Sequence, residues 1–309
     1  MQYNNTDLVR NKIFFEYKGE CMKILVTGSN GQLGRELSIQ LTEEQADFVG
    51  YDIPEFDITD KNAMIPIIDR ENPDIIINCG AMTNVDGCET NRDAAFAINA
   101  EGPKNLAEIA RDRDITLVQV STDYVFDGNG IKENGVVRPY VESDAIAPNT
   151  VYGASKAKGE KYVAEICPKH FIVRTAWLYG DGNNFVKTML RLSESHSELT
   201  VVNDQIGTPT CTKDLAAAII RLIKTEAYGI YHGTCEGVCS WYDFACEIFK
   251  QSHIDINVRP VTTEEYGNKT PRPAYSVLEN AGLEKLGINV FRPWKEALAG
   301  YLSWLSEQK

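Results

Sequence analysis

Short apolar segments alternate with helix-like segments through the first half of this chain of 309 residues. The strand-like segments cover residues 23–27, 47–51, 74–78, 116–121 and 171–174, and the helix-like segments cover 32–41, 61–71, 99–113 and about 149–166. Apolar strands separated by helices are typical of a parallel sheet with both faces covered. The alternation therefore predicts an α/β fold built on a doubly wound parallel sheet.

A glycine-rich turn, Gly28-Ser-Asn-Gly-Gln-Leu-Gly34, joins the first strand to the first helix. Glycines there let backbone N–H groups and the helix N-terminus approach a pyrophosphate. The strand before the turn and the helix after it favour a Rossmann-type dinucleotide site over an ordinary turn. The residues expected to contact this cofactor are Gly28, Asn30, Gly31, Gln32, Leu33, Gly34, Asp52, Asp57, Ile58, Ala81, Thr83, Tyr152 and Lys156.

The choice between NADH and NADPH depends on the end of the second strand. Asp52 stands there, where a carboxylate can accept a hydrogen bond from the adenosine ribose and would repel a 2′-phosphate. This position favours NADH mildly. Arg35, next to the glycine-rich turn, leaves NADPH open.

The chain contains one Tyr-x-x-x-Lys sequence, Tyr152-Gly-Ala-Ser-Lys156, at the start of an expected helix. Positions i and i+4 share a helix face, so the ammonium is expected to favour the phenolate and lower the tyrosine pKa from about 10 toward neutrality. Thr122, at the end of the strand 116–121, can donate its hydroxyl to a substrate carbonyl. Together with the glycine-rich turn, these residues predict a hydride-transfer site rather than a solvated Tyr-Lys pair.

After Trp177 the pattern loosens into shorter elements, with helices expected near 185–192, 213–224, 240–251 and 294–305. We expect residues 22–178 to form mainly the NAD(P)-binding Rossmann domain. Residues 179–309 are expected to form mainly a smaller substrate-binding lobe, with some elements returning to the Rossmann domain. Residues 1–21 read as a leader that is separate from the core, and Met22 is a candidate start.

The net charge of −13 argues against binding to nucleic acid or to an acidic membrane, since both need a basic face. No apolar run reaches the about eighteen residues of a membrane span, and charged residues interrupt residues 1–21, which argues against a signal peptide. The eight cysteines are scattered, as expected for reduced thiols. Cys235, Cys239 and His232 lack the spacing of a zinc site. A cytoplasmic protein without an assignable metal site is expected.

Seven strings of residues resemble the extended short-chain dehydrogenase/reductases, and among them the dTDP-4-dehydrorhamnose reductase family. They are residues 22–34, Ser-Thr-Asp-Tyr-Val-Phe-Asp-Gly at 121–128, 151–156, Arg-Thr-Ala-Trp-Leu-Tyr at 174–179, 183–190, Asn-Asp-Gln-Ile-Gly-Thr-Pro-Thr at 203–210, and 272–276. The resemblance implies a catalytic triad of Thr122, Tyr152 and Lys156. It also implies a substrate pocket shaped by Trp177, Asn184, Gln205 and Arg272.

The reaction implied by the resemblance is reduction of the C4 ketone of a dTDP-sugar, dTDP-4-dehydro-L-rhamnose, by NADH or NADPH. Some relatives form homodimers with a bound Mg²⁺, but its ligands cannot be assigned here. The leader and a slightly extended loop at 131–137 depart from the family pattern. The loop puts substrate detail in doubt more than chemistry.

Two other readings remain open for the substrate half and for the function. Trp177 can be a core residue, and Arg174 and Arg272 can form ion pairs instead of meeting a diphosphate. An epimerase or dehydratase shares the same motifs, but a dehydratase usually adds an acidic pair, and here Asp123 is followed by Tyr124. A non-catalytic module similar to the regulatory subunit of methionine adenosyltransferase is disfavoured by the complete triad.

Overall fold

The computed structural model describes residues 16–17, 20–267 and 269–308. Of the expected leader, only β1 (Glu16–Tyr17) and β2 (Glu20–Cys21) are described, and they pair with each other in antiparallel fashion. Residues 1–15 and 18–19, on which most of the leader prediction rests, lie outside the described residues.

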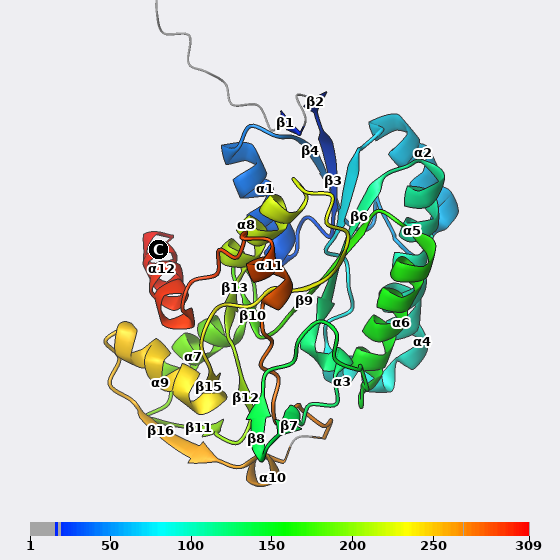
Figure 1. The fold of residues 1–309 in the computed structure, drawn as a ribbon. Coiled ribbons are helices and arrows are strands. Elements are labelled where there is room, and N and C mark those ends of the chain that lie inside the picture. Colours follow the sequence, from blue (N-terminus) through cyan, green and yellow to red (C-terminus); the bar gives the residue numbers. More distant parts are fainter. Residues whose placement is uncertain (1–15, 18–19, 268, 309) are drawn as a thin grey trace, which may run out of the picture.

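A parallel sheet forms the centre of the molecule (Figure 1). Its strands are β3 (Lys23–Thr27), β4 (Asp47–Tyr51), β5 (Ile75–Asn78), β6 (Thr116–Thr122), β9 (His170–Thr175) and β14 (Gly229–His232). Their spatial order is β14-β9-β6-β5-β3-β4, and every neighbouring pair is parallel. The order reverses direction between β3 and β5, which is the arrangement of a doubly wound sheet. The predicted fold class is confirmed.

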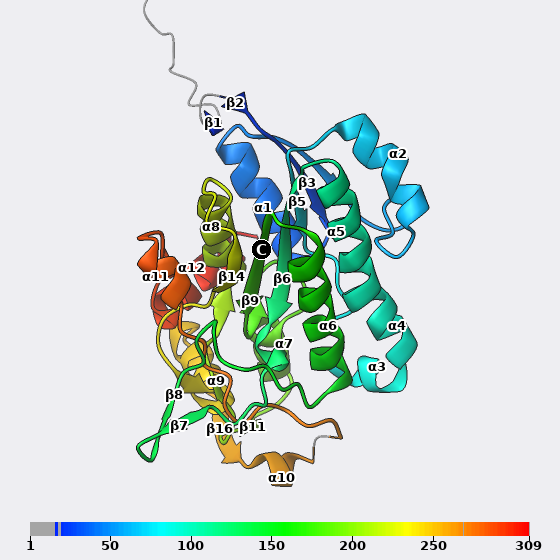
Figure 2. The ribbon, with the colours of Figure 1, turned by 45° about the vertical axis from the view of Figure 1, so that its right-hand side comes forward.

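Side chains that alternate along each strand bury themselves in two separate cores. Ile24 and Val26 pack with α1 (Gln32–Glu43) and α8 (Thr212–Leu222) on one face. Leu25 between them packs with helices of the opposite face. The helices of that face are α2 (Lys61–Glu71), α5 (Gly102–Asp112) and α6 (Val151–Ile166), as Figure 2 shows. Burial on both faces explains why the strands are apolar throughout.

Shorter elements connect β5 to α5 and β6 to α6. They are α3 (Val85–Thr90), α4 (Arg92–Phe96), the π-helical turn η1 (Ala97–Glu101), the 3-10 turn η2 (Asp123–Val125), and the hairpin β7 (Ile131–Glu133) with β8 (Val136–Arg138). The helix expected at 99–113 is thus divided between η1 and α5. The loop expected to be extended at 131–137 is this hairpin.

The rest of the second half forms a smaller lobe beyond the carboxyl ends of the strands (Figure 1). Its elements are β10 (Leu178–Tyr179), α7 (Phe185–Ser193), β11 (Glu198–Val202), β12 (Ile206–Gly207), β13 (Thr210–Cys211), β15 (Cys239–Ser240), α9 (Trp241–Gln251), β16 (Asn257–Val261), α10 (Thr263–Tyr266) and α12 (Trp294–Glu307). α11 (Ala281–Lys285) packs instead against β14. β11 and β16 pair in parallel, and α9 packs against both. β14 and α8 belong instead to the Rossmann layers.

Two glycines of the turn after β3 are required by close backbone contacts. Gly28 has φ +63°, and a Cβ there would lie 2.7 Å from the backbone nitrogen of Gly80, which follows β5. A Cβ on Gly34 would lie 2.3 Å from the carbonyl oxygen of Gly28. The turn after β3 and the loop after β5 therefore meet at the point where the sheet order reverses, which is where ligands bind in such sheets.

Candidate active site

A cavity of about 670 Å³ opens at the carboxyl ends of the strands. Its lining combines residues far apart in sequence: the glycine-rich turn at 31–34, the end of β6, Tyr152 and Lys156 of α6, and side chains of the smaller lobe. Among the residues expected in the site, those that line the cavity are Gly31, Gln32, Leu33, Gly34, Ala81, Thr83, Thr122, Tyr152, Lys156, Trp177, Gln205 and Arg272. Residues expected to bind the cofactor, to catalyse the reaction and to bind the substrate thus line one cavity.

The remaining expected cofactor residues do not line the cavity; they are Gly28, Asn30, Asp52, Asp57 and Ile58. Asp52 accepts a hydrogen bond from the Asn30 backbone N–H at 2.9 Å and another from Ile53. Asp57 accepts hydrogen bonds from Thr59, and the side chain of Ile58 is buried in the core. Asp52 therefore fixes the conformation of the glycine-rich turn, whatever it contributes to a ribose.

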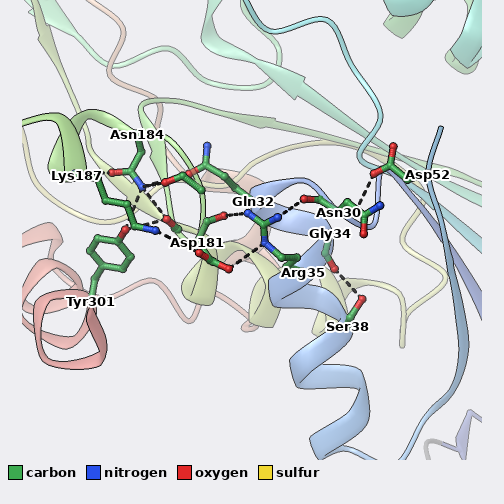
Figure 3. A network of polar contacts seen from close by, with 12 residues as sticks. Asn30, Gln32, Gly34, Arg35, Ser38, Asp52, Asp181, Asn184, Lys187 and Tyr301 are labelled. Carbon is green, nitrogen blue, oxygen red and sulfur yellow. Dashed lines mark hydrogen bonds and ion pairs between the residues drawn. The ribbon is translucent and has the colours of Figure 1, made fainter. Parts of the chain in front are cut away.

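Asn184 is not brought into the cavity. Its Nδ2 donates to the Gly180 carbonyl at 2.7 Å and to the Tyr301 hydroxyl at 3.0 Å, and its Oδ1 caps α7. Figure 3 shows how this network continues to α1, where the guanidinium of Arg35 pairs with Asp181 at 3.0 Å. The same guanidinium donates to the backbone carbonyls of Asn30 and Asp181. Asn184 and Arg35 thus hold the smaller lobe against the start of α1.

Lys156 is buried at the centre of the site, with 4% of its surface exposed. Its Nζ donates a hydrogen bond of 2.6 Å to the Val120 carbonyl on β6. Burial lowers the Lys156 pKa to about 8, and the charge of Glu160, one turn further along α6, opposes this shift. The ammonium is therefore positioned beside the carboxyl end of β6.

The expected lowering of the Tyr152 pKa is wrong for this structure. Burial raises the pKa of Tyr152, the nearby Asp123 carboxyl adds to the rise, and a hydrogen bond with Thr122 opposes it. The sequence places Lys156 one turn away but does not reveal that the phenol is almost fully enclosed. In this environment desolvation of the phenolate exceeds the effect of a cation one turn away.

Thr122, Asp123 and Tyr124 form a compact polar group beside Tyr152. The Thr122 hydroxyl donates to Asp123 Oδ1 at 2.8 Å and accepts a hydrogen bond from the Tyr124 N–H at 3.3 Å. The ring of Tyr124 meets that of Tyr152 edge-on, with centroids 5.4 Å apart. Burial raises the pKa of Asp123 to about 7 and that of Tyr124 to about 12.

Aromatic residues line the end of the cavity formed by the smaller lobe. Trp177, which follows β9 in a left-handed conformation (φ +48°), stacks on Trp241 with ring centroids 3.6 Å apart and planes 9° apart. Phe185 packs against Trp241, and the exposed Tyr266 lines the opening. We call Trp177, Phe185 and Trp241 the aromatic wall.

Gln205 and Arg272 also reach this end of the cavity. Gln205 is buried and donates to the Thr263 hydroxyl at 3.0 Å, which ties the loop before β12 to α10. Arg272 pairs with Asp86 of α3 at 2.9 Å and also meets the hydroxyl of Tyr124. Arg272 therefore bridges the two halves of the cavity.

Arg174, a second candidate for a diphosphate, is a structural residue. Its guanidinium forms a bidentate pair with Glu160 at 2.8–3.2 Å, and only 3% and 4% of the two side chains are exposed. It also lies over the Phe126 ring at 5.1 Å.

Sequence reasoning missed Trp241 and Tyr266, because the contacts that bring them to the cavity join distant segments. Within the described residues there is no group of three or more His, Cys, Asp or Glu side chains arranged to hold a metal ion. No helix of the described part is long and apolar enough to cross a membrane.

Comparison with known proteins adds a family to this geometry. A family model described as the RmlD substrate binding domain matches residues 22–306. The spore coat polysaccharide biosynthesis protein SpsK of Bacillus subtilis is 45% identical, over 91% of this chain and 96% of its own. A dTDP-4-dehydrorhamnose reductase of Aggregatibacter actinomycetemcomitans is 40% identical over 89% of this chain and 97% of its own. A dTDP-4-keto-6-deoxy-D-glucose reductase of Streptomyces niveus is also 40% identical, over 89% and 94%.

Two solved structures share the fold closely. A dTDP-4-dehydrorhamnose reductase of Clostridium acetobutylicum superposes with a TM-score of 0.89 at 49% identity, over 92% of this chain and 100% of its own. A second, from Bacillus anthracis in complex with NADP, gives a TM-score of 0.87 at 42% identity, over 92% and 99%. From the family match and these relatives, the chain belongs to the RmlD family, that of the dTDP-4-dehydrorhamnose reductases.

Proposed function

We propose that this chain reduces the C4 ketone of dTDP-4-dehydro-L-rhamnose to dTDP-L-rhamnose with NADPH or NADH, in nucleotide-sugar and cell-surface polysaccharide biosynthesis. The observation that carries the proposal is the single cavity in which the glycine-rich turn, the Thr122-Tyr152-Lys156 cluster and the aromatic wall meet. The names of the chain's relatives support the same reaction, as does the NADP bound in one related structure.

The residues present fit a dinucleotide. A Cβ at Gly28 or Gly34 would collide with neighbouring backbone, so only glycine allows the tight turn whose N–H groups can approach a pyrophosphate. The turn itself is held by Asp52 and Arg35. When bound, the reduced nicotinamide supplies the hydride.

The chain's own residues position the ketone and manage the proton. Tyr152, protonated because burial raises its pKa, donates its proton to the C4 oxygen as negative charge develops there. Lys156 places a positive charge at the end of β6, beside the same site. The buried surroundings exclude water and strengthen both interactions. The aromatic wall and Arg272 are proposed to receive the sugar nucleotide.

The test measures ketone-dependent oxidation of NADPH and of NADH, monitored as the loss of absorbance of the reduced cofactor. Wild type is compared with Tyr152→Phe. The matched control is Tyr162→Phe, on the same helix and outside the cavity. We expect Tyr152→Phe to lower kcat about 10²-fold or more and the control to stay near wild type. Turnover of dTDP-4-keto-6-deoxy-D-glucose but not of dTDP-4-dehydro-L-rhamnose would move the assignment to the other named reaction of the family.

Further features belong to the same proposal. We propose that residues 22–178 mainly hold the cofactor and 179–309 mainly the sugar nucleotide. A cytoplasmic location and a homodimer are proposed as well, and size-exclusion chromatography with and without added Mg²⁺ tests the dimer.

A further inference from the structure

The hydroxyl of Thr122 lies between two polar partners, Asp123 and Tyr152. It donates to Asp123 Oδ1 at 2.8 Å, and it also hydrogen-bonds to Tyr152. A hydroxyl carries a single proton, so it can donate to only one of them at a time. While the Thr122 hydroxyl donates to Asp123, it can interact with Tyr152 only as a hydrogen-bond acceptor.

Asp123 is an unusual carboxyl for a pocket. It is 4% exposed, lines the cavity, and its Oδ2 has no hydrogen-bond partner of normal geometry within the described residues. A buried carboxylate with an unsatisfied oxygen is unfavourable, whereas the protonated acid can direct an O–H toward a neighbour. The surroundings therefore favour an Asp123 that gains and loses a proton during the reaction.

We propose that Asp123 returns a proton to Tyr152 through the Thr122 hydroxyl after each reduction. This rests on the proposed reductase function, in which Tyr152 gives its proton to the substrate and is left as phenolate. The O–H bond of the Asp123 acid breaks as a new O–H bond forms on Thr122 Oγ1. The original O–H bond of Thr122 breaks as that of Tyr152 is restored. No electrons are exchanged, and Asp123 takes its proton back from bulk solvent after the product has left the cavity.

The hydrogen bond of 2.8 Å between Thr122 and Asp123 Oδ1 supplies the first link of such a transfer. After the transfer, the carboxylate is left accepting from the Thr122 hydroxyl. The direction of transfer is favourable, because burial raises the pKa of Tyr152 above its ordinary value while the Asp123 pKa is about 7. At neutral pH a large share of Asp123 is protonated and able to donate.

The other polar and titratable groups near this pair come from α3, η2, α6 and the segment after α10. They are Asp86 and Cys88, Tyr124, Tyr152 and Lys156, and Arg272 and Ser276. Arg272 is occupied by Asp86, and the Tyr124 pKa of about 12 makes it a poor donor. Lys156, with a pKa of about 8, is the competing proton source, but its Nζ donates to the Val120 carbonyl, and among the described residues no hydrogen bond joins it to Tyr152.

The test compares the pH profiles of kcat for wild type and Asp123→Asn, which keeps the shape of the side chain but cannot supply an acidic proton. The wild-type kcat should fall as pH rises through about 7, because the proton-donating form of Asp123 is lost. In Asp123→Asn this limb should be absent. The ratio of wild-type to variant kcat should therefore drop from about tenfold or more at pH 6 to about twofold or less at pH 9.

A structural role for Asp123 would give a ratio that does not change with pH, and that result would overturn the proposal. Asp60→Asn, a conservative change at the N-cap of α2, is the matched control and should keep the wild-type profile. If Asp123→Asn does not fold, Thr122→Val and Thr122→Ser replace it: only the valine variant should lose the limb near pH 7. A wild type that reduces no ketone at any pH would overturn the proposed function, and the relay with it. An active wild type with parallel profiles would overturn the relay alone.

Discussion

Breaking the buried pair of Arg174 and Glu160 should destabilise the fold strongly. The two side chains are 3% and 4% exposed, and their charged atoms approach to 2.8 Å. Two unit charges about 4 Å apart attract each other by about 4 kcal/mol at an effective dielectric constant of about 20. Arg174→Met leaves Glu160 as a buried, unpaired charge, a situation that destabilises by about 3–5 kcal/mol. With an unfolding entropy of about 2.1 cal/mol/K per residue, this loss corresponds for 309 residues to a fall in Tm of roughly 5–8 °C.

A double-mutant cycle separates the loss of the pair from the isolation of a charge. Glu160→Leu should be as damaging as Arg174→Met, since it leaves a buried guanidinium. The double variant, which leaves neither charge, should recover much of the loss, because apolar replacement of a buried pair is often close to neutral. Thermal unfolding at one scan rate measures all four proteins.

Two outcomes would refute this reasoning. If each single variant lowered Tm by less than about 2 °C, the pair would be energetically equivalent to an exposed one. If the double variant lost the sum of the two single losses, the side chains would not be coupled. Glu160→Leu carries a further signature: the Glu160 charge raises the pKa of Lys156, so its removal should move that pKa further below about 8.

Three further changes test the site. Gly34→Ala, whose Cβ would lie 2.3 Å from the Gly28 carbonyl oxygen, should weaken NADPH binding at least tenfold in a fluorescence titration; unchanged affinity would contradict the tight turn. Lys156→Met should abolish turnover yet raise Tm at pH 7, since the folded-state pKa of about 8 lies below the ordinary value of about 10.5. The burial penalty is full below pH 8 and gone above about pH 10.5, so the gain in Tm should vanish there; a gain independent of pH would contradict it. Trp241→Ala, which removes the stacking partner of Trp177, should raise the KM for the sugar nucleotide about tenfold with little effect on the Kd for NADPH; equal effects on both would argue against a substrate role.

The fold could be predicted because each sheet strand except the last has a strong local signal. Ile75, Ile76 and Ile77 are buried on both faces of the sheet, and such continuous apolar runs differ from the alternation of a half-exposed strand. β14 has only four residues, Gly229–His232, and its membership of the sheet depends on pairing with β9 across more than fifty positions. Local sequence carries no record of that pairing.

The convergence of Thr122, Tyr152 and Lys156 could be predicted for the same topological reason. Carboxyl ends of parallel strands share one edge of the sheet, so a residue ending β6 and a helix that follows it reach the glycine-rich turn. The pKa of Tyr152 and the contacts of Asn184 could not be predicted, because they depend on burial and on long-range partners. The Tyr152 pKa is governed by burial, and Asn184 bonds to Tyr301, 117 positions away, instead of facing the cavity.

The segment between Trp177 and Phe185 contacts both α1, which follows the glycine-rich turn, and the aromatic wall. At its centre, Gly182 packs so closely on α1 that a Cβ there would lie 2.8 Å from Gln32 Cγ and 3.0 Å from the Arg35 guanidinium. Its two ends carry two of the three residues of the aromatic wall. A cofactor that shifts the start of α1 must therefore move this segment or strain it, because packed interiors transmit displacements rather than absorb them. The glycine-rich end and the aromatic end of the cavity thus share this one tightly packed segment.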